Sequence, residues 1–107
     1  GDATLLPGFM DAHTHLGFGN EEVGDGRFAT LQQTIPERAL AAVPSARKTL
    51  HAGFTTVRDL GGTDFINIGL RDAINKGHIE GPRMLTVAYA IGTTGGHCDS
   101  TNGYRFG

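Results

Sequence analysis

Residues 5–16 read LLPGFMDAHTHL, and the rest of the chain is organised around them. Read as a β-strand that ends at His15, this stretch sends successive side chains to opposite faces. Asp11, His13 and His15 then share one face, and the other face is mostly apolar. Two imidazoles on one strand face can reach the same ion, and neutral imidazole is an ordinary ligand of zinc and related metals. The stretch therefore predicts a metal site at His13 and His15.

The His-x-His spacing alone would also fit a chance pair on the surface, because the chain contains five histidines. Its context favours the metal site. The Pro-Gly break and the Asp-Ala-His-Thr-His ending of residues 7–15 resemble the first barrel strand of the amidohydrolase superfamily. Residues 52–59, 81–83 and 94–99 are also similar to that superfamily. Within it, they resemble the branch of imidazolonepropionase-like and prolidase-like enzymes, which includes Xaa-Pro dipeptidases and ochratoxin-degrading amidohydrolases.

This resemblance implies an α/β fold, namely the first three βα units of a metal-dependent (β/α)8 TIM barrel. It implies zinc, with another divalent metal as the alternative, in a binuclear site of the full-length enzyme, with His13 and His15 as ligands. The remaining ligands and the catalytic base would come from later strands, beyond Gly107, so we expect no catalytic residue in this chain. The implied activity is hydrolysis of a C–N amide bond in a small amide or dipeptide, of aminoacyl, N-acyl amino acid or Xaa-Pro type.

Length and charge limit the alternatives. The chain has 107 residues, whereas a complete (β/α)8 barrel needs about 250. We therefore expect residues 1–107 to be the N-terminal part of one barrel domain, without the β-sandwich that precedes it in the family and without the later strands. The net charge is -2 and the nine Lys and Arg residues are scattered, which argues against nucleic acid or an anionic membrane as partner. A homo-oligomer is compatible with the sequence, and the compartment, cytoplasmic or secreted, stays open.

The first expected helix has recognisable signals at both ends. Thr34 and Glu37 have the spacing of a capping box, so a helix should begin there. Gly53 should end it. Pro44 lies inside this helix, where a proline removes a hydrogen bond and clashes with the preceding turn. We therefore expect a kink near Val43, or two short helices.

The remaining elements alternate between strand and helix. Residues 54–59 are rich in β-branched side chains and predict a second strand. Asp64 is the expected N-cap of a second helix with apolar residues at helical spacing, which Gly77 should end. Residues 83–90 are mostly apolar and predict a third strand. Strands that alternate with helices indicate parallel pairing through right-handed crossovers.

Five further side chains invite functional readings. The resemblance places His97 beside the metal centre as a contact for a substrate carboxylate or carbonyl; the alternative is a histidine that bonds within its own loop. Asp11 either orients an imidazole or caps the strand in a purely structural way. For Arg58 and Asp59, a structural ion pair is favoured over a role in the pocket. We expect Cys98 to be a small buried thiol rather than a nucleophile.

Three hypotheses remain. The chain is part of a metal-dependent amidohydrolase, or a metal-binding module without catalytic function, or a truncated segment that does not fold stably alone.

Overall fold

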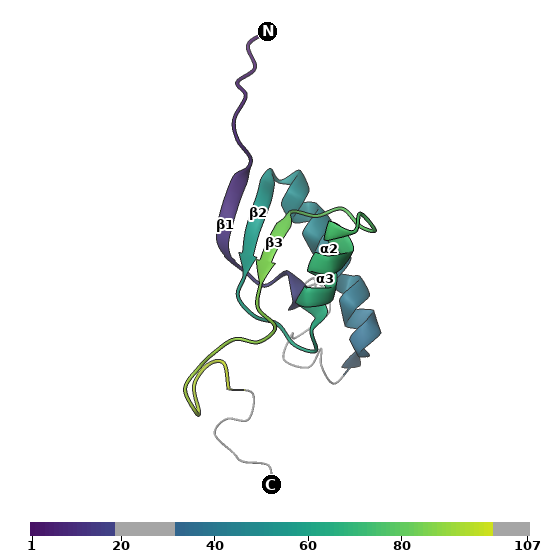
Figure 1. Ribbon diagram of the computed structural model, residues 1–107, viewed down its shortest axis with the longest axis vertical. Helices are drawn as coiled ribbons and strands as arrows, with labels where there is room; N and C mark the ends of the chain where they lie inside the picture. Colours follow the sequence, from purple (N-terminus) through teal and green to yellow (C-terminus); the bar gives the residue numbers. More distant parts are fainter. Residues whose placement is uncertain (19–31, 100–107) are drawn as a thin grey trace.

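A computed structural model describes residues 1–18 and 32–99 of the chain. In this part, three parallel strands form one sheet, and two α-helices lie together on one side of it (Figure 1). The elements, in chain order, are β1 (Phe9–Thr14), the short 3-10 helix η1 (Leu16–Phe18), α2 (Ile35–His51), β2 (Phe54–Asp59), α3 (Ile66–Asn75) and β3 (Arg83–Thr86). The strands pair in the order β1-β2-β3. β1 and β2 are therefore each followed by a crossover that returns the chain to a parallel neighbour, as the sequence predicted.

Helix α2 begins as the capping box predicted. The Glu37 amide donates to Thr34 Oγ1 at 3.4 Å, and the Thr34 amide donates to Glu37 Oε2 at 3.3 Å. The helix runs through Pro44 without a break, so the prediction of two short helices is wrong. A proline removes one ladder bond, but burial of α2 against the sheet continues on both sides of it, at Ala42 and Ala46.

The hydrophobic core lies between the helices and the sheet. It is formed by buried side chains of α2, β2, α3 and β3, namely Ala42, Ala46, Val57, Ile66, Leu70 and Met84. The opposite face of the sheet has no helix over it among the described residues (Figure 1). There Met10 is 76% exposed and Leu85 is 58% exposed. This is the arrangement of adjacent units in a (β/α)8 barrel, whose helices lie outside and whose helix-free sheet face lies inside.

Several predicted boundaries need correction. Strand β1 ends at Thr14, one residue before His15, and β3 ends at Thr86 rather than near residue 90. Asp64 is not the N-cap of α3: the cap is Phe65, in a left-handed conformation and without a side-chain hydrogen bond. The Asp64 carboxylate instead accepts from the Arg38 guanidinium of α2 at 2.9 Å. Asp64 therefore bonds to α2 instead of capping α3, and the local sequence pattern does not predict this contact.

Two predictions about single residues are also wrong. Arg58 and Asp59, both within the described residues, form no ion pair, because adjacent residues of a strand face opposite sides of the sheet. Arg58 Nε donates to the Ala12 carbonyl at 2.7 Å, and Asp59 is fully buried on the helix side. Cys98 is exposed rather than buried, since the later part of the segment after β3 extends away from the sheet and its helices (Figure 1).

Candidate metal centre

The two histidines of the opening motif meet at the carboxyl end of β1. His13 is the next-to-last residue of the strand, and His15 follows it directly before η1. Their Nε2 atoms lie 3.2 Å apart, and their ring centroids are 5.1 Å apart. Both imidazoles thus lie on the same side, with Nε2 of each ring pointing toward the other.

This spacing fits a shared metal ion. Two Zn–N bonds of about 2.0–2.1 Å at a tetrahedral angle place the two nitrogens about 3.3–3.4 Å apart. The observed separation of 3.2 Å is close to that value. His13 and His15 therefore need little rearrangement to hold one ion between their Nε2 atoms.

The ring of His15 is oriented by the strand next to it. His15 Nδ1 lies 3.1 Å from the carbonyl oxygen of Gly61, which follows β2. A carbonyl oxygen can only accept, so Nδ1 carries the proton, and in the neutral ring Nε2 keeps its lone pair for a metal. The Phe18 ring, with its centroid 5.4 Å from that of His15, covers another side of the imidazole. Position 61 requires glycine, because its φ is +130° and a Cβ there would lie 2.8 Å from the backbone nitrogen of Ala90.

The Asp11 carboxylate bonds to the backbone of the His13-Thr14-His15 motif. Its Oδ1 accepts from the His13 amide at 3.0 Å. Within the described residues it makes no hydrogen bond to either imidazole. This contact corresponds to the strand-capping alternative, and a role toward an imidazole stays a prediction.

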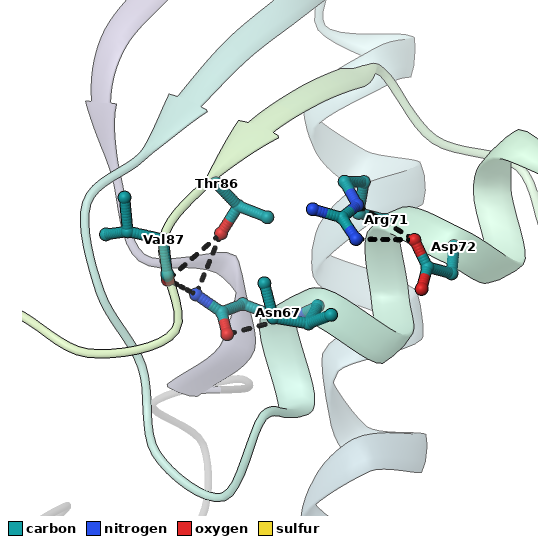
Figure 2. A network of polar contacts seen from close by, with 6 residues as sticks. Asn67, Arg71, Asp72, Thr86 and Val87 are labelled. Atoms are coloured by element: carbon teal, nitrogen blue, oxygen red, sulfur yellow. Dashed lines mark hydrogen bonds and ion pairs between the residues drawn. The ribbon is translucent and has the colours of Figure 1, made fainter.

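The sequence reasoning missed a buried polar pair directly behind the histidines. Asp59 and Asn67 are both 0% exposed, and Asn67 Nδ2 donates to Asp59 Oδ1 at 3.0 Å. Figure 2 shows Asn67 reaching from the first turn of α3 to Thr86 and Val87 at the end of β3. The available signal was that Asp59 shares a strand face with Val57. If that face is turned to the core, a carboxylate on it needs donors.

The described chain also has a shallow hollow of about 230 Å³ on the open face of the sheet. Arg58 crosses it to reach the Ala12 carbonyl. Neither histidine lines it; its walls are formed by Met10, Asp11, Ala12, Thr56, Val57, Arg58 and Leu85. The hollow therefore lies further down the inner face of the sheet than the histidine pair.

The structure does not bring His97 to the histidine pair. Its side chain is exposed, and no hydrogen bond or ring contact joins it to His13 or His15 within residues 1–18 and 32–99. Its segment is bonded within itself: the Gly96 amide donates to Thr93 O at 2.9 Å and the Gly95 amide donates to Asp99 Oδ2 at 2.8 Å. The segment extends beyond the sheet (Figure 1). The substrate role of His97 stays a prediction.

The site is incomplete within the part of the chain that the structure describes. No group of three or more His, Cys, Asp or Glu side chains there has the arrangement of a metal site.

The described part of the chain contains no helix long and apolar enough to cross a membrane.

Known proteins are similar to this chain in sequence and in fold. The sequence profile of the amidohydrolase family matches residues 4–103. The chain belongs to the amidohydrolase family. Ochratoxinase of Aspergillus niger is 31% identical over 96 residues, which are 89% of this chain and 19% of the ochratoxinase. This amidohydrolase chain thus spans about a fifth of that curated relative.

Two solved structures extend the comparison. A Xaa-Pro dipeptidase with methionine bound in its active site is 39% identical, with a TM-score of 0.74, over 92% of this chain and 24% of the dipeptidase. The crystal structure of Aspergillus niger ochratoxinase is 29% identical, with a TM-score of 0.70, over 87% of this chain and 20% of the ochratoxinase. These neighbours are amidohydrolase TIM barrels, so the expected superfamily, its prolidase-like branch and the fold class are confirmed. The open face of the sheet is the inner face of the barrel.

Proposed function

We propose that the protein containing this chain is a metal-dependent hydrolase of a C–N amide bond. The observation that carries the proposal is the 3.2 Å approach of His13 Nε2 and His15 Nε2. The Gly61 carbonyl on His15 Nδ1 supports it, because it leaves the other ring nitrogen available as a ligand. A bound zinc ion would lower the pKa of a coordinated water, so that hydroxide is available as the nucleophile at neutral pH, and would polarise the carbonyl of the scissile bond.

The residues of this chain have a limited part in such a reaction. His13 and His15 hold the metal, and Asp11 fixes the backbone amide of His13. His97 binds a carboxylate or carbonyl of the substrate and so fixes its orientation. The proposed metal is Zn²⁺ in a binuclear site, whose other ligands and base come from outside this chain. The 107-residue chain alone is then inactive, and it is unstable because its inner face and sheet edges are uncovered.

The proposed substrate is a small amide or dipeptide of aminoacyl, N-acyl amino acid or Xaa-Pro type. Two relatives support this class: one is a Xaa-Pro dipeptidase with bound methionine, and the other is an ochratoxinase. The net charge of -2, with no basic stripe, supports a small ligand over nucleic acid or a membrane surface.

The test uses the full-length protein with a panel of Xaa-Pro dipeptides and N-acyl amino acids. We expect stoichiometric bound zinc, hydrolysis of at least one of the two substrate groups, loss of hydrolysis on treatment with a chelator, and recovery when zinc is added back. Hydrolysis that persists in protein shown to be metal-free would contradict the proposal. Stoichiometric zinc with no hydrolysis of any panel member would favour a non-catalytic metal-binding module instead.

A further inference from the structure

Asp59, at the carboxyl end of β2, receives hydrogen bonds from the elements around it. Its Oδ2 accepts from the Leu16 amide at 2.7 Å, and its Oδ1 accepts from Asn67 Nδ2 at 3.0 Å. Two longer contacts come from the hydroxyls of Thr14, at 3.5 Å, and Thr86, at 3.4 Å. A carboxylate is an acceptor at both oxygens, so it satisfies donors from β1, β3 and α3 together. Since Asp59 is 0% exposed, water does not replace these partners.

Asn67 completes this junction from the helix side. Besides Asp59, its Nδ2 contacts Thr86 Oγ1 at 2.8 Å and the Val87 carbonyl at 2.6 Å, as Figure 2 shows for the end of β3. The segments that follow β1 and β2 also lie close to the Asn67 side chain. A Cβ added at Gly17 would lie 3.1 Å from the Asn67 side chain, and one at Gly62 would lie 3.0 Å from it. Asn67 therefore touches the chain just beyond all three strands.

These contacts converge on His15. The Leu16 amide that Asp59 holds belongs to the peptide bond formed by His15. On the other side of His15, the Thr14 carbonyl accepts from the Leu60 amide at 3.1 Å. The ring itself contacts the carbonyl of Gly61, two residues after Asp59. The end of β2 thus fixes the backbone on both sides of His15 and the orientation of its imidazole, whereas the His13 amide is held by Asp11 of its own strand.

We propose that the buried Asp59–Asn67 pair positions His15 for metal binding, by locking the ends of β1, β2 and β3 to the start of α3. This inference rests on the proposed metal site at His13 and His15. A merely structural role would make the pair important for stability alone. A positioning role requires that metal affinity and ligand geometry change more than they do in an equally destabilised variant that leaves the pair intact.

The decisive variant is Asp59→Asn in the full-length protein. It keeps the shape of the side chain but places an amide donor against the Leu16 amide or Asn67 Nδ2, each of which is itself a donor. We expect zinc affinity, measured by competition with a chromogenic chelator, to fall about 10- to 100-fold, the usual cost of removing a residue that orients a ligand. The visible absorption spectrum of the cobalt-substituted protein should also change, because the ligand geometry around the ion is altered.

The control for Asp59→Asn is Val57→Ala. Val57 lies on the same strand and face and is 1% exposed, but it belongs to the apolar core rather than to the polar junction. We expect this variant to lose stability while keeping zinc affinity within about twofold of wild type and an unchanged cobalt spectrum.

Thr86→Val is a milder second variant, which decides the question if Asp59→Asn does not fold. It removes the hydroxyl that contacts Asn67 Nδ2 and Asp59 Oδ1, and should weaken zinc binding by several-fold. Its control is Thr49→Val, because the Thr49 hydroxyl donates to the Ser45 carbonyl within α2 and contacts no other polar group among residues 1–18 and 32–99. Zinc affinities and cobalt spectra that match the controls in every folded variant would overturn the positioning role alone. Wild-type protein that binds no zinc would overturn the proposed function, and the positioning role with it.

Discussion

The end of β1 and the segment after β3 each present histidine side chains, but these are held in different ways. The His15 ring is held from the end of β2, by the contact of its Nδ1 with the Gly61 carbonyl at 3.1 Å, and the His13 amide is held by Asp11 of its own strand. His97 lies in residues 93–99, whose backbone bonds, from the Gly96 amide to Thr93 and from the Asp99 amide to Gly96, stay within those residues. A metal ligand must keep its geometry before the ion arrives, whereas a substrate contact can form on closure. The comparison predicts that the first pair controls metal content and that His97 controls turnover.

The largest expected effect tests the first half of this comparison. The double variant His13→Ala, His15→Ala in the full-length protein should lose at least one equivalent of zinc by elemental analysis, and hydrolysis should fall below detection. His51→Ala is the matched control, because His51 is an exposed histidine on α2 that contacts Glu80 at 3.7 Å. Zinc content equal to wild type in the double variant would refute the ligand assignment.

The second half of the comparison predicts an intermediate effect. His97→Ala should leave zinc content intact and lower kcat/KM by about one to three orders of magnitude, which corresponds to about 1.4 kcal/mol for each tenfold. The reason is that loss of a group that orients the substrate does not remove a metal ligand. His78→Ala, at an exposed position after α3, is the control. Wild-type kcat/KM would favour a histidine that serves only its own loop, and loss of zinc would make His97 a ligand.

The smallest expected effect separates stability from the site. Thr34→Ala removes the hydroxyl that caps α2 through the Glu37 amide, and should lower the free energy of unfolding by about 1 kcal/mol. Thr34→Ser keeps the cap and should stay close to wild type. Chemical denaturation measures the difference. Zinc content should be unchanged in both variants, so a loss of zinc with Thr34→Ala would show that the helix start and the metal centre are coupled.

The sequence could predict what depends on local pattern. The capping box at Thr34 and Glu37 and the shared side of His13 and His15 follow from spacings of two or three residues, and the structure has both. The predictions that failed depend on contacts between distant segments. Asp64 bonds to Arg38 of another helix instead of capping its own.

The buried pair behind His15 was missed for the same reason. Which face of β2 is turned to the helices cannot be read from the strand alone, and that choice decides whether Asp59 is a surface carboxylate or the acceptor for the Leu16 amide. The bonds of Asn67 to Thr86 and Val87 likewise join residues about twenty positions apart. Such partners emerge only when the sheet order and the helix positions are known.

The most direct test is X-ray diffraction from crystals of the full-length protein grown with zinc, with data collected on both sides of the zinc absorption edge. We predict an anomalous peak about 2.0–2.1 Å from Nε2 of both His13 and His15, with His15 Nδ1 still on the Gly61 carbonyl. Zinc-loaded crystals without a peak between these two nitrogens, or with His15 turned so that Nδ1 faces the ion, would contradict the proposed metal centre.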